Sequence, residues 1–455
     1  MKYDAVIIGT GQAGPPLAAK LAGNGIKTAI IEKDTYGGTC VNVGCTPTKA
    51  YVASARRAWA AKNSAELGVS VQGDVQINLK KIKARKDKIV EESREGLKDF
   101  LHGQENLDTY HGKAVFTGPK TLEVAGDTLE ADQIFINVGA KPRIPDGFDK
   151  VDYLTNASIL ELEEIPEHLI IVGGGYIGLE FGQMFSRFGS EVTIIEKGNK
   201  LLKKEDNDIA QAITQIIKSE GINLRLNAEC VSGLEENGQV TVDLDCDEDV
   251  NRVSGSHLLM AAGRVPATDS LGLEHTEITV DDRGYISVND HLETTVENVF
   301  ALGDCNGEGA FTHTAYNDYQ IVSSYLFDDG ERTLNNRYTC YAAYIDPPLA
   351  RVGLNEAQVK EKGINAKMAT RPMTRVARAK EKGETQGLMK IIVEAETDKI
   401  LGATFLGTGA DEYIHSIIDL MYAGAPYTVI RDAVHIHPTV SELIPTMLEQ
   451  LEPLK

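Results

Sequence analysis

Two stretches of the chain share one pattern of apolar and polar positions. The first reads YDAVIIGTGQAG at residues 3–14 and continues to TAIIEK at 28–33, and the second reads HLIIVGGGYIG at 168–178 and continues to VTIIEK at 192–197. In both, an apolar run meets a glycine-rich turn, a helix-like segment follows, and a second apolar run ends in an acid. This order of elements predicts a βαβ unit in each stretch.

The two predicted units match at a constant offset of 164 residues. The matched pairs are Gly9 and Gly173, Gly11 and Gly175, Gly14 and Gly178, Gly25 and Gly189, and Glu32 and Glu196. In a G-x-G-x-x-G turn the glycines allow a tight turn, close approach of the backbone to a pyrophosphate, and packing of helix on strand. The pyrophosphate then lies at a helix N-terminus, where free N–H groups favour anions. The acid lies where a ribose hydroxyl is held.

The pattern therefore predicts two dinucleotide sites. A lone glycine-rich turn can serve packing alone, but each unit here has both the preceding strand and the downstream acid. We expect FAD at the first unit and a nicotinamide coenzyme at the second. Glu196 favours NAD(H), because a carboxylate repels the 2′-phosphate of NADP(H). The neighbouring Lys197 keeps NADP(H) open as an alternative.

The remaining pattern predicts an α/β fold with a further α+β domain at the C-terminal end. A chain of 455 residues with 42% apolar residues corresponds to about three domains. We expect two Rossmann-like dinucleotide-binding domains: an FAD domain at 1–148 and 268–335, and a nicotinamide domain inserted at 149–267. From residue 336 to 455, apolar runs such as LMKIIVEA precede helix-like segments, which is typical of an antiparallel sheet with helices. The acidic stretch at 243–255 is expected to form a solvated hairpin.

Charge narrows the range of partners. The net charge of −21 and the pI near 5 argue against nucleic acid and against an anionic membrane, since both attract basic surfaces. No apolar window reaches the length of a membrane span, and no signal peptide is apparent, so a cytoplasmic location is expected. No pattern of metal ligands stands out.

Cys40 and Cys45 carry the candidate chemistry, in the segment GGTCVNVGCTPTK. In a regular helix their Cα atoms would be about 8.6 Å apart, whereas a disulfide tolerates less than about 7 Å. A bond between them therefore requires a distorted backbone. Gly44 relaxes the backbone, and Pro47 lacks an N–H and clashes with the carbonyl of Val43. We expect a helix from about Thr48 onward.

Two interpretations of this pair are open from the residues themselves. The two cysteines could be small thiols in a packed turn. Their position just after a dinucleotide fingerprint, in a compartment expected to be reducing, favours a redox role instead. The other cysteines have no near neighbour in sequence and are interpreted as structural: Cys230, Cys246, Cys305 and Cys340.

The segment GGTC-x4-C-x-P-T-K between two nucleotide fingerprints resembles the class I pyridine nucleotide-disulfide oxidoreductases, a family that includes dihydrolipoyl dehydrogenase, glutathione reductase and mercuric reductase. The resemblance covers essentially the whole chain. It implies that Cys40 exchanges with substrate, that Cys45 is the thiolate beside the flavin, and that Lys49 lies near the flavin ring, paired with Glu180.

The resemblance also assigns residues later in the chain. TTVENVFALGDCNG looks like the second FAD motif, opened by Thr294, with Gly303 and with Asp304 on the ribityl chain. INVGAKPRIP and MAAGRVP, the latter containing Gly263 at the nicotinamide site, look like crossovers between the two nucleotide domains.

HIHPTVSE looks like the acid/base motif of the family, in which His437 is oriented by Glu442. In the family this pair comes from the other subunit, so a homodimer with a shared active site is implied. An isolated histidine before a proline would otherwise be an ordinary half-buried residue, and His435 is taken as structural. The chemistry is consistent, because histidine titrates near neutrality and can exchange protons with thiols.

The sequence indicates the family more clearly than the branch within it. No cysteine follows Cys340, whereas mercuric reductases typically carry a C-terminal pair. The stretch YIDPPLARVGLNEAQVKEKG looks closest to a mercuric-reductase-like branch without those cysteines, linked to reactive chlorine and metal stress. We therefore expect an NAD(P)H-dependent flavoenzyme whose acceptor is a disulfide, an oxidant or a metal ion. Dihydrolipoyl dehydrogenase is the alternative, and a flavin redox sensor of low turnover, or a flavin oxidase, are the alternatives of other kinds.

Overall fold

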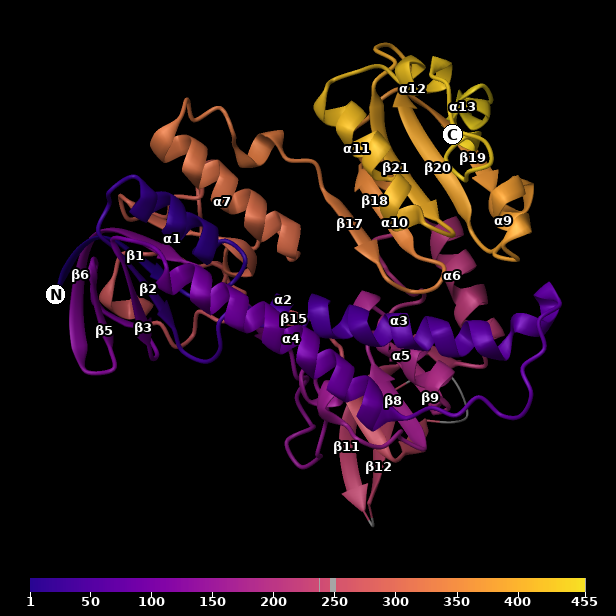
Figure 1. The fold of residues 1–455 in the computed structure, drawn as a ribbon, viewed down its shortest axis with the longest axis horizontal. Coiled ribbons are helices and arrows are strands. Elements are labelled where there is room, and N and C mark those ends of the chain that lie inside the picture. Colours follow the sequence, from indigo (N-terminus) through magenta and orange to yellow (C-terminus); the bar gives the residue numbers. More distant parts are fainter. Residues whose placement is uncertain (237, 246–250, 455) are drawn as a thin grey trace.

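The structure is a computed structural model that describes residues 1–236, 238–245 and 251–454 (Figure 1). Three sheets form the centres of three units. The N-terminal unit lies on the left of Figure 1, the unit around β8 lies below the centre, and the C-terminal unit lies at the upper right. The mixed α/β architecture, with two units that each contain a βαβ motif and a C-terminal α+β unit, agrees with the sequence prediction.

The first predicted βαβ unit lies in a seven-stranded sheet ordered β3-β2-β1-β6-β5-β4, with β16 pairing the end of β6. Its strands are β1 (Lys2–Ile8), β2 (Thr28–Glu32), β3 (Leu107–His111), β4 (Val115–Gly118), β5 (Thr121–Val124), β6 (Asp127–Ile136) and β16 (Val299–Ala301). Strands β1, β2, β3, β6 and β16 are parallel, as buried apolar runs favour. Helices α1 (Gly14–Gly23) and α7 (Thr312–Phe327) pack against this sheet through apolar side chains.

The second unit has a four-stranded parallel sheet ordered β10-β9-β8-β14. Its elements are β8 (His168–Val172), α5 (Tyr176–Phe188), β9 (Glu191–Glu196), α6 (Asn207–Ser219), β10 (Asn223–Leu226) and β14 (His257–Met260). Two short strands, β7 (Ala140–Pro142) and β15 (Arg264–Pro266), pair antiparallel where the chain passes between the first two units, as the two crossover motifs predict. Phe148 packs among the core residues of the second unit.

A small antiparallel sheet flanks the second unit. It consists of β11 (Glu229–Glu236), β12 (Gln239–Asp245) and β13 (Arg252–Gly255). Strands β12 and β13 pair antiparallel, as expected for a hairpin at 243–255. Cys246 and residues 247–250 lie outside the described residues.

The C-terminal unit is a six-stranded antiparallel sheet ordered β17-β18-β21-β20-β19-β22. Its strands are β17 (Cys340–Ala343), β18 (Leu349–Gly353), β19 (Ala366–Pro372), β20 (Leu388–Glu394), β21 (Ile400–Leu406) and β22 (Glu452–Pro453). Its helices are α8 (Glu356–Glu361), α9 (Ala377–Glu381), α10 (Ala410–Tyr413), α11 (His415–Tyr422), α12 (Thr428–Asp432) and α13 (Leu443–Leu448). The sheet with helices is the arrangement that the alternating apolar runs predict.

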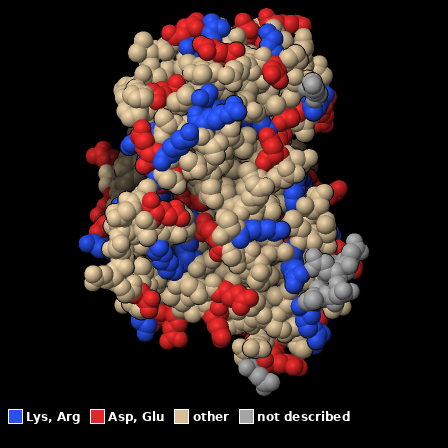
Figure 2. Space-filling model, turned by 90° about the vertical axis from the view of Figure 1, so that its right-hand side faces the viewer, with Lys and Arg blue, Asp and Glu red and all other residues tan. Residues whose placement is uncertain are grey.

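Three helices lead through the centre of the molecule: α2 (Gly38–Asn42), α3 (Cys45–Lys62) and α4 (Leu79–His102). Short 3-10 turns complete the described elements: η1 (Ser64–Leu67), η2 (Ser158–Glu161), η3 (Leu273–His275), η4 (Gly303–Asn306), η5 (Leu334–Asn336) and η6 (Met373–Arg375). Within the described part of the chain, no helix has the length and apolarity needed to cross a membrane. On the face in Figure 2, blue Lys and Arg side chains lie scattered among acidic and uncharged ones.

The second and third units are joined by buried ion pairs. Lys390 of β20 is 1% exposed, and its ammonium forms ion pairs with three carboxylates. It pairs with Asp206, with Asp208 at 2.7 Å, and with Glu356. Arg187 of α5 contacts Asp346 at 2.7 Å. Charges removed from water stabilise a contact only when they are paired and hydrogen-bonded. The pairs therefore fix how the second unit docks on the third.

Candidate active site

The two cysteines lie on either side of a break between two helices. Cys40 lies in α2, and Cys45 is the first residue of α3. Val43 and Gly44 leave the helical conformation, with ψ of 16° and −117°. A Cβ on Gly44 would lie 2.8 Å from the carbonyl oxygen of Thr39, so a side chain at this position would clash.

Helix α3 begins at Cys45, whereas the sequence led us to expect a start near Thr48. The reason is the place of Pro47 in the first helical turn. N–H groups in that turn have no partner within the helix, so the missing N–H of proline costs nothing there. The helix therefore extends back to Cys45, and the sulfur lies at its N-terminal end.

The surroundings of Cys45 favour a thiolate. The pKa of the Cys45 thiol is lowered to about 6, mainly by the hydrogen bond from Cys40 and further by Thr312 and Lys49. Burial and the charge of Glu180 act in the opposite direction and raise it. The hydroxyl of Thr312 lies 3.2 Å from the Cys45 sulfur. The pKa of Cys40 is raised, mainly by the same hydrogen bond and by burial. In the reduced pair, the lowered pKa of Cys45 and the raised pKa of Cys40 favour the negative charge on Cys45.

Lys49 and Glu180 are brought together from different units. The Lys49 ammonium on α3 lies 2.7 Å from the Glu180 carboxylate on α5, which is 3% exposed. The backbone N–H of Tyr344 donates to the second oxygen of Glu180 at 2.8 Å, and the Tyr344 ring lies 4.7 Å from the Lys49 nitrogen. A cation is thereby held close to Cys45 by residues of all three units.

The first glycine-rich turn is closely packed around Asn137. A Cβ at Gly9 would lie 2.4 Å from the carbonyl oxygen of Asn137, and one at Gly14 would lie 2.3 Å from the carbonyl oxygen of Gly9. At Gly11 a Cβ would meet the Asn137 amide at 3.1 Å. The buried carboxylate of Glu32 accepts hydrogen bonds from the backbone N–H groups of Thr10 and Asp34 and from the Thr10 hydroxyl.

The second turn repeats this packing. A Cβ at Gly173 would lie 2.3 Å from the carbonyl oxygen of Ala261, and one at Gly178 would lie 2.0 Å from that of Gly173, whereas Gly175 faces open space. The Glu196 carboxylate accepts the N–H of Gly174 at 2.8 Å and of Gly198 at 2.7 Å.

Gly263 lies in the second crossover, and Gly303 and Asp304 lie in η4. Gly263 has a φ of +111°, which glycine tolerates, and its carbonyl oxygen accepts the N–H of Arg143. The N–H of Gly303 donates to Asp318 at 2.7 Å. Burial raises the pKa of Asp304. The guanidinium of Arg264, 3.7 Å away, lowers it but does not offset the effect of burial. Thr294 lies in the loop before β16.

His437 and Glu442 form a pair distant from the cysteines. The Nδ1 atom of His437 lies 2.9 Å from Glu442, and the His437 side chain is 76% exposed. Neighbouring Val434 and Ile436 are 101% and 80% exposed. Figure 1 shows α13, which follows Glu442, at the far end of the C-terminal unit from α2. A histidine held at Nδ1 by a carboxylate offers Nε2 for proton transfer.

Comparison with known proteins settles the family. The profile described as "Pyridine nucleotide-disulphide oxidoreductase" matches residues 3–318, and that described as "Pyridine nucleotide-disulphide oxidoreductase, dimerisation domain" matches residues 339–448. The chain belongs to the class I pyridine nucleotide-disulfide oxidoreductases. Enzymes of this family use FAD and NAD(P)H, and the dimerisation domain makes this oxidoreductase a homodimer. The family, the fold class and the cofactors predicted from the sequence are thus confirmed.

Three relatives illustrate the similarity. The chain is 37% identical to the probable pyridine nucleotide-disulfide oxidoreductase RclA of Escherichia coli K12, over 97% of each chain. It is 32% identical to a mercuric reductase of Staphylococcus aureus, over 95% of this chain and 81% of the other. It is 33% identical to a dihydrolipoyl dehydrogenase of Thermus scotoductus, over 97% and 95%. The Cu(II) complex of E. coli RclA, described as an HOCl-induced flavoprotein disulfide reductase, superposes with a TM-score of 0.89, 35% identity and 99% coverage of both chains.

The residues of this oxidoreductase fit a bound FAD. Among the described residues, the Asn137 side-chain nitrogen is buried without a hydrogen-bond partner, next to Gly11 and Gly14. A buried unpaired donor at a glycine turn is explained when a phosphate or a bound water completes it. The open space at Gly175, at the start of α5, likewise fits a second dinucleotide.

Four residues near the site carry no clear signal in the sequence. Thr312 contacts the Cys45 sulfur, Tyr344 contacts Lys49, and Asn137 lines the first glycine turn. The centre of the Tyr176 ring lies 5.5 Å from that of Phe311, with the two rings tilted at 40°, and burial raises the pKa of Tyr176 to about 12. Tyr176 directly follows Gly175 in the fingerprint, which is the one positional hint the sequence offers.

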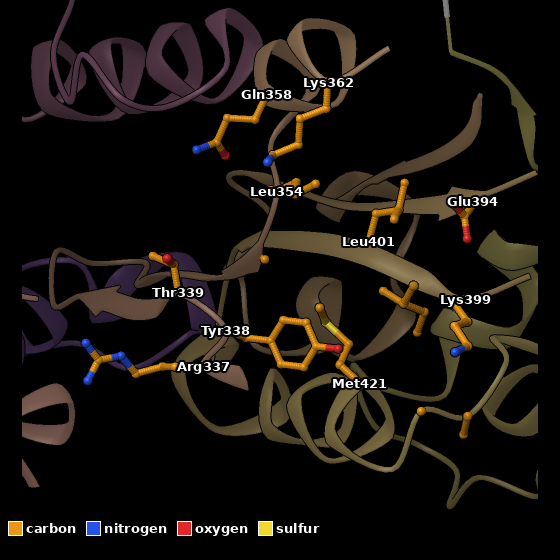
Figure 3. Close-up of a pocket in the computed structure, with 14 residues that line it drawn as sticks. Arg337, Tyr338, Thr339, Leu354, Gln358, Lys362, Glu394, Lys399, Leu401 and Met421 are labelled. Carbon is orange, nitrogen blue, oxygen red and sulfur yellow. The ribbon is translucent and has the colours of Figure 1, made fainter. Parts of the chain in front are cut away.

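Two other features lie outside this site. Asp206, Asp208 and Glu356 are close enough to hold a cation, but Lys390 already lies among them. A pocket of about 390 Å³ lies in the C-terminal unit (Figure 3). It is lined by Arg337, Tyr338, Thr339, Gly353, Leu354, Gln358, Lys362, Glu394, Lys399, Ile400, Leu401, Met421, Gly424 and Ala425. None of the predicted site residues lines it.

Proposed function

We propose that this oxidoreductase passes electrons from NAD(P)H to the Cys40–Cys45 pair and from there to a metal ion, with Cu(II) as the first acceptor to test. The observation that carries the proposal is the position of Cys40 and Cys45 on either side of a helix break, with the Thr312 hydroxyl 3.2 Å from the Cys45 sulfur and Lys49 held nearby by Glu180. The Cu(II) complex of the similar RclA protein supports the choice of metal. We also propose a cytoplasmic location, where NAD(P)H is available.

The proposed roles of the residues follow from their environment. Bound at the first glycine-rich turn, FAD would supply the two-electron link between NAD(P)H and the disulfide. The disulfide gains two electrons and one proton and opens into the Cys40 thiol and the Cys45 thiolate. Lys49, Thr312 and the Cys40 hydrogen bond stabilise the negative charge on Cys45. Glu180 holds Lys49 in place at 2.7 Å.

Re-oxidation of the pair completes the cycle. Two Cu(II) ions each take one electron and become Cu(I), the sulfur–sulfur bond re-forms, and the Cys40 proton leaves. We propose that His437 of the partner subunit accepts this proton. This assignment explains why the His437–Glu442 pair is exposed and apart from the cysteines of its own chain. Carboxylate-held histidines act as such bases in many enzymes.

The same residues support NADH as the preferred donor. The Glu196 carboxylate is fixed by two backbone N–H groups at the end of β9, where the ribose of the coenzyme is held in this fold. A 2′-phosphate placed there would be repelled. Lys197 pairs with Glu229, so part of its charge is already neutralised.

Anaerobic turnover tests this proposal. The purified enzyme, given NADH or NADPH, should oxidise the coenzyme when Cu(II) is added and should form two Cu(I) per coenzyme. The Cys45→Ser variant should lose this activity. Turnover with lipoamide and not with Cu(II) would instead favour a dihydrolipoyl dehydrogenase. Failure to turn over with any acceptor would favour a redox sensor.

A further inference from the structure

A side chain from the nicotinamide-binding unit forms a hydrogen bond to the backbone between the two cysteines. Asn156 precedes η2, and its neighbour Leu154 bridges to Leu259 of the parallel sheet in that unit. The side-chain nitrogen of Asn156 donates to the carbonyl oxygen of Val43 at 2.7 Å, across 113 residues of sequence. Val43 lies between Cys40 and Cys45, so this bond holds the peptide that joins the two redox residues.

Val43 needs an outside donor because it lies in the break between α2 and α3, where neither helix supplies a partner for its carbonyl oxygen. In a continuous helix its carbonyl oxygen would accept the N–H of residue 47, four positions on. Pro47 has no N–H, and in the described part of the chain Asn156 is the donor that contacts the Val43 oxygen. A half-buried carbonyl left without a partner is destabilising. The Asn156 amide therefore gives the Val43 carbonyl the partner that the two helices do not supply.

The other side of the cysteine loop is held separately. Asn42, at the end of α2, donates to the carbonyl oxygens of Tyr36 and Gly38 at 2.9 Å, and its own oxygen accepts from Arg94 of α4 at 3.0 Å. These bonds fix the helix that carries Cys40. The Asn156 bond supports the other side of the loop, where α3 begins at Cys45.

We propose that Asn156 is a positioning residue for the redox pair: by holding the Val43–Gly44 peptide, it keeps the Cys40 thiol within hydrogen-bonding reach of the Cys45 sulfur. The proposal rests on the redox role proposed above for the pair. It also gives the nicotinamide-binding unit a direct contact with the loop that carries the dithiol.

The Cys45 thiolate provides a readout that needs neither coenzyme turnover nor an acceptor. The FAD-containing dimer is fully reduced with a thiol reductant, and its ultraviolet thiolate absorbance is followed against pH. Subtracting the curve of the matching protein with Cys45→Ser isolates the Cys45 contribution. The midpoint should lie near pH 6 in the natural protein. A failed proposal for the acceptor leaves this measurement unaffected.

The Asn156→Ala variant should raise the Cys45 midpoint by about one pH unit, because the hydrogen bond from Cys40 loosens. Asn156→Leu, which keeps the size of the side chain but removes the donor, should raise it similarly. The matched control is Asn63→Ala, since Asn63 donates to the carbonyl oxygen of Trp59 at 2.9 Å at the other end of the same helix. Its midpoint should stay that of the natural protein.

Two outcomes overturn the proposal. One is an unchanged midpoint in the Asn156 variants. The other is an equal rise in Asn63→Ala, which would show that any loosening of α3 has the same effect. A rise confined to the Asn156 variants supports the positioning role.

Discussion

The ammonium of Lys49 lies 2.7 Å from the carboxylate of Glu180, and this bond joins the helix that starts at Cys45 to α5, the first α-helix of the second unit. Glu180 is also the acceptor for the backbone N–H of Tyr344 in the C-terminal unit. One buried carboxylate thus sets the position of the cation nearest the thiolate. Its charge also opposes that thiolate, because it raises the Cys45 pKa.

Replacing Glu180 with Gln should lower the Cys45 pKa further. The variant removes a negative charge that raises this pKa and leaves the Lys49 charge less compensated. The pH titration of the thiolate should therefore shift below the midpoint of the natural protein. Glu163→Gln, on an exposed surface pair, is the control and should change nothing. An upward shift in Glu180→Gln would contradict this account of the charges.

Removing the hydroxyl of Thr312 should have the opposite effect. Thr312 lies 3.2 Å from the Cys45 sulfur and lowers its pKa by a hydrogen bond. A depressed thiol pKa means that the thiolate is lost as pH falls through about 6. In Thr312→Val the loss should begin about one unit higher, so that the reduced protein loses thiolate absorbance at a higher pH. Thr312→Ser keeps the hydroxyl and should behave as the natural protein does.

Replacing Lys390 with Met should destabilise the enzyme and make its stability depend on divalent cations. Lys390 neutralises Asp206, Asp208 and Glu356, which otherwise lie within 4.8 Å of one another. Removing one partner of a buried ion pair costs about 3–5 kcal/mol. Thermal unfolding should show a lower Tm, and added Ca²⁺ should recover part of it in the variant only. A Tm that ignores Ca²⁺ would mean that the three carboxylates separate or take up protons instead.

Mixed dimers should recover activity that neither parent has. Cys45→Ser and His437→Ala homodimers should both be inactive if each active site takes His437 of the partner subunit. A dimer with one subunit of each kind has one intact site, so random exchange of equal amounts should give about a quarter of the natural activity. Activity is measured as NADH oxidation after exchange. No recovery in verified mixed dimers would place both residues in one subunit's site.

Replacing Glu196 with Ala should shift the coenzyme preference toward NADPH. The change removes the carboxylate expected to repel a 2′-phosphate, so the ratio of kcat/KM for NADPH to that for NADH should rise about tenfold, equivalent to about 1.4 kcal/mol. Glu32→Ala alters the equivalent acid of the other unit and should leave this ratio unchanged. Equal ratios in the natural protein and in Glu196→Ala would show that another residue selects the coenzyme.

The sequence predicted those parts of the molecule that depend on local spacing. The offset between the two glycine-rich units located both nucleotide folds, because Gly173 and Gly178, like Gly9 and Gly14, lie where any Cβ would collide with backbone. The spacing of Cys40 and Cys45 likewise required a break between them. The start of α3 was placed three residues too late, because the proline was treated as an interruption rather than as part of a first turn.

The contacts that tune the site could not be predicted in this way. Thr312 lies 267 residues from Cys45, and Asn156 lies 113 residues from Val43. Such contacts depend on how complete units dock, and no short pattern marks the residues that meet. The buried cluster around Lys390 is of the same kind, since its acids come from α6, its N-cap and α8. The roles assigned to the individual site residues and the domain boundaries stay predictions until the variants are measured.

The place of β16 in the first sheet has a consequence for synthesis of the protein. Strand β6 ends at Ile136, and its parallel neighbour β16 begins at Val299, about 160 residues later. At ribosomal rates of about 5–20 residues per second, that strand emerges roughly 8–30 seconds after β6. The unit around β8, which lies between these two strands in the sequence, leaves the ribosome first. The first unit, though it begins the chain, is therefore completed second, and a ligand that needs its complete sheet can bind only after the neighbouring unit has had time to fold.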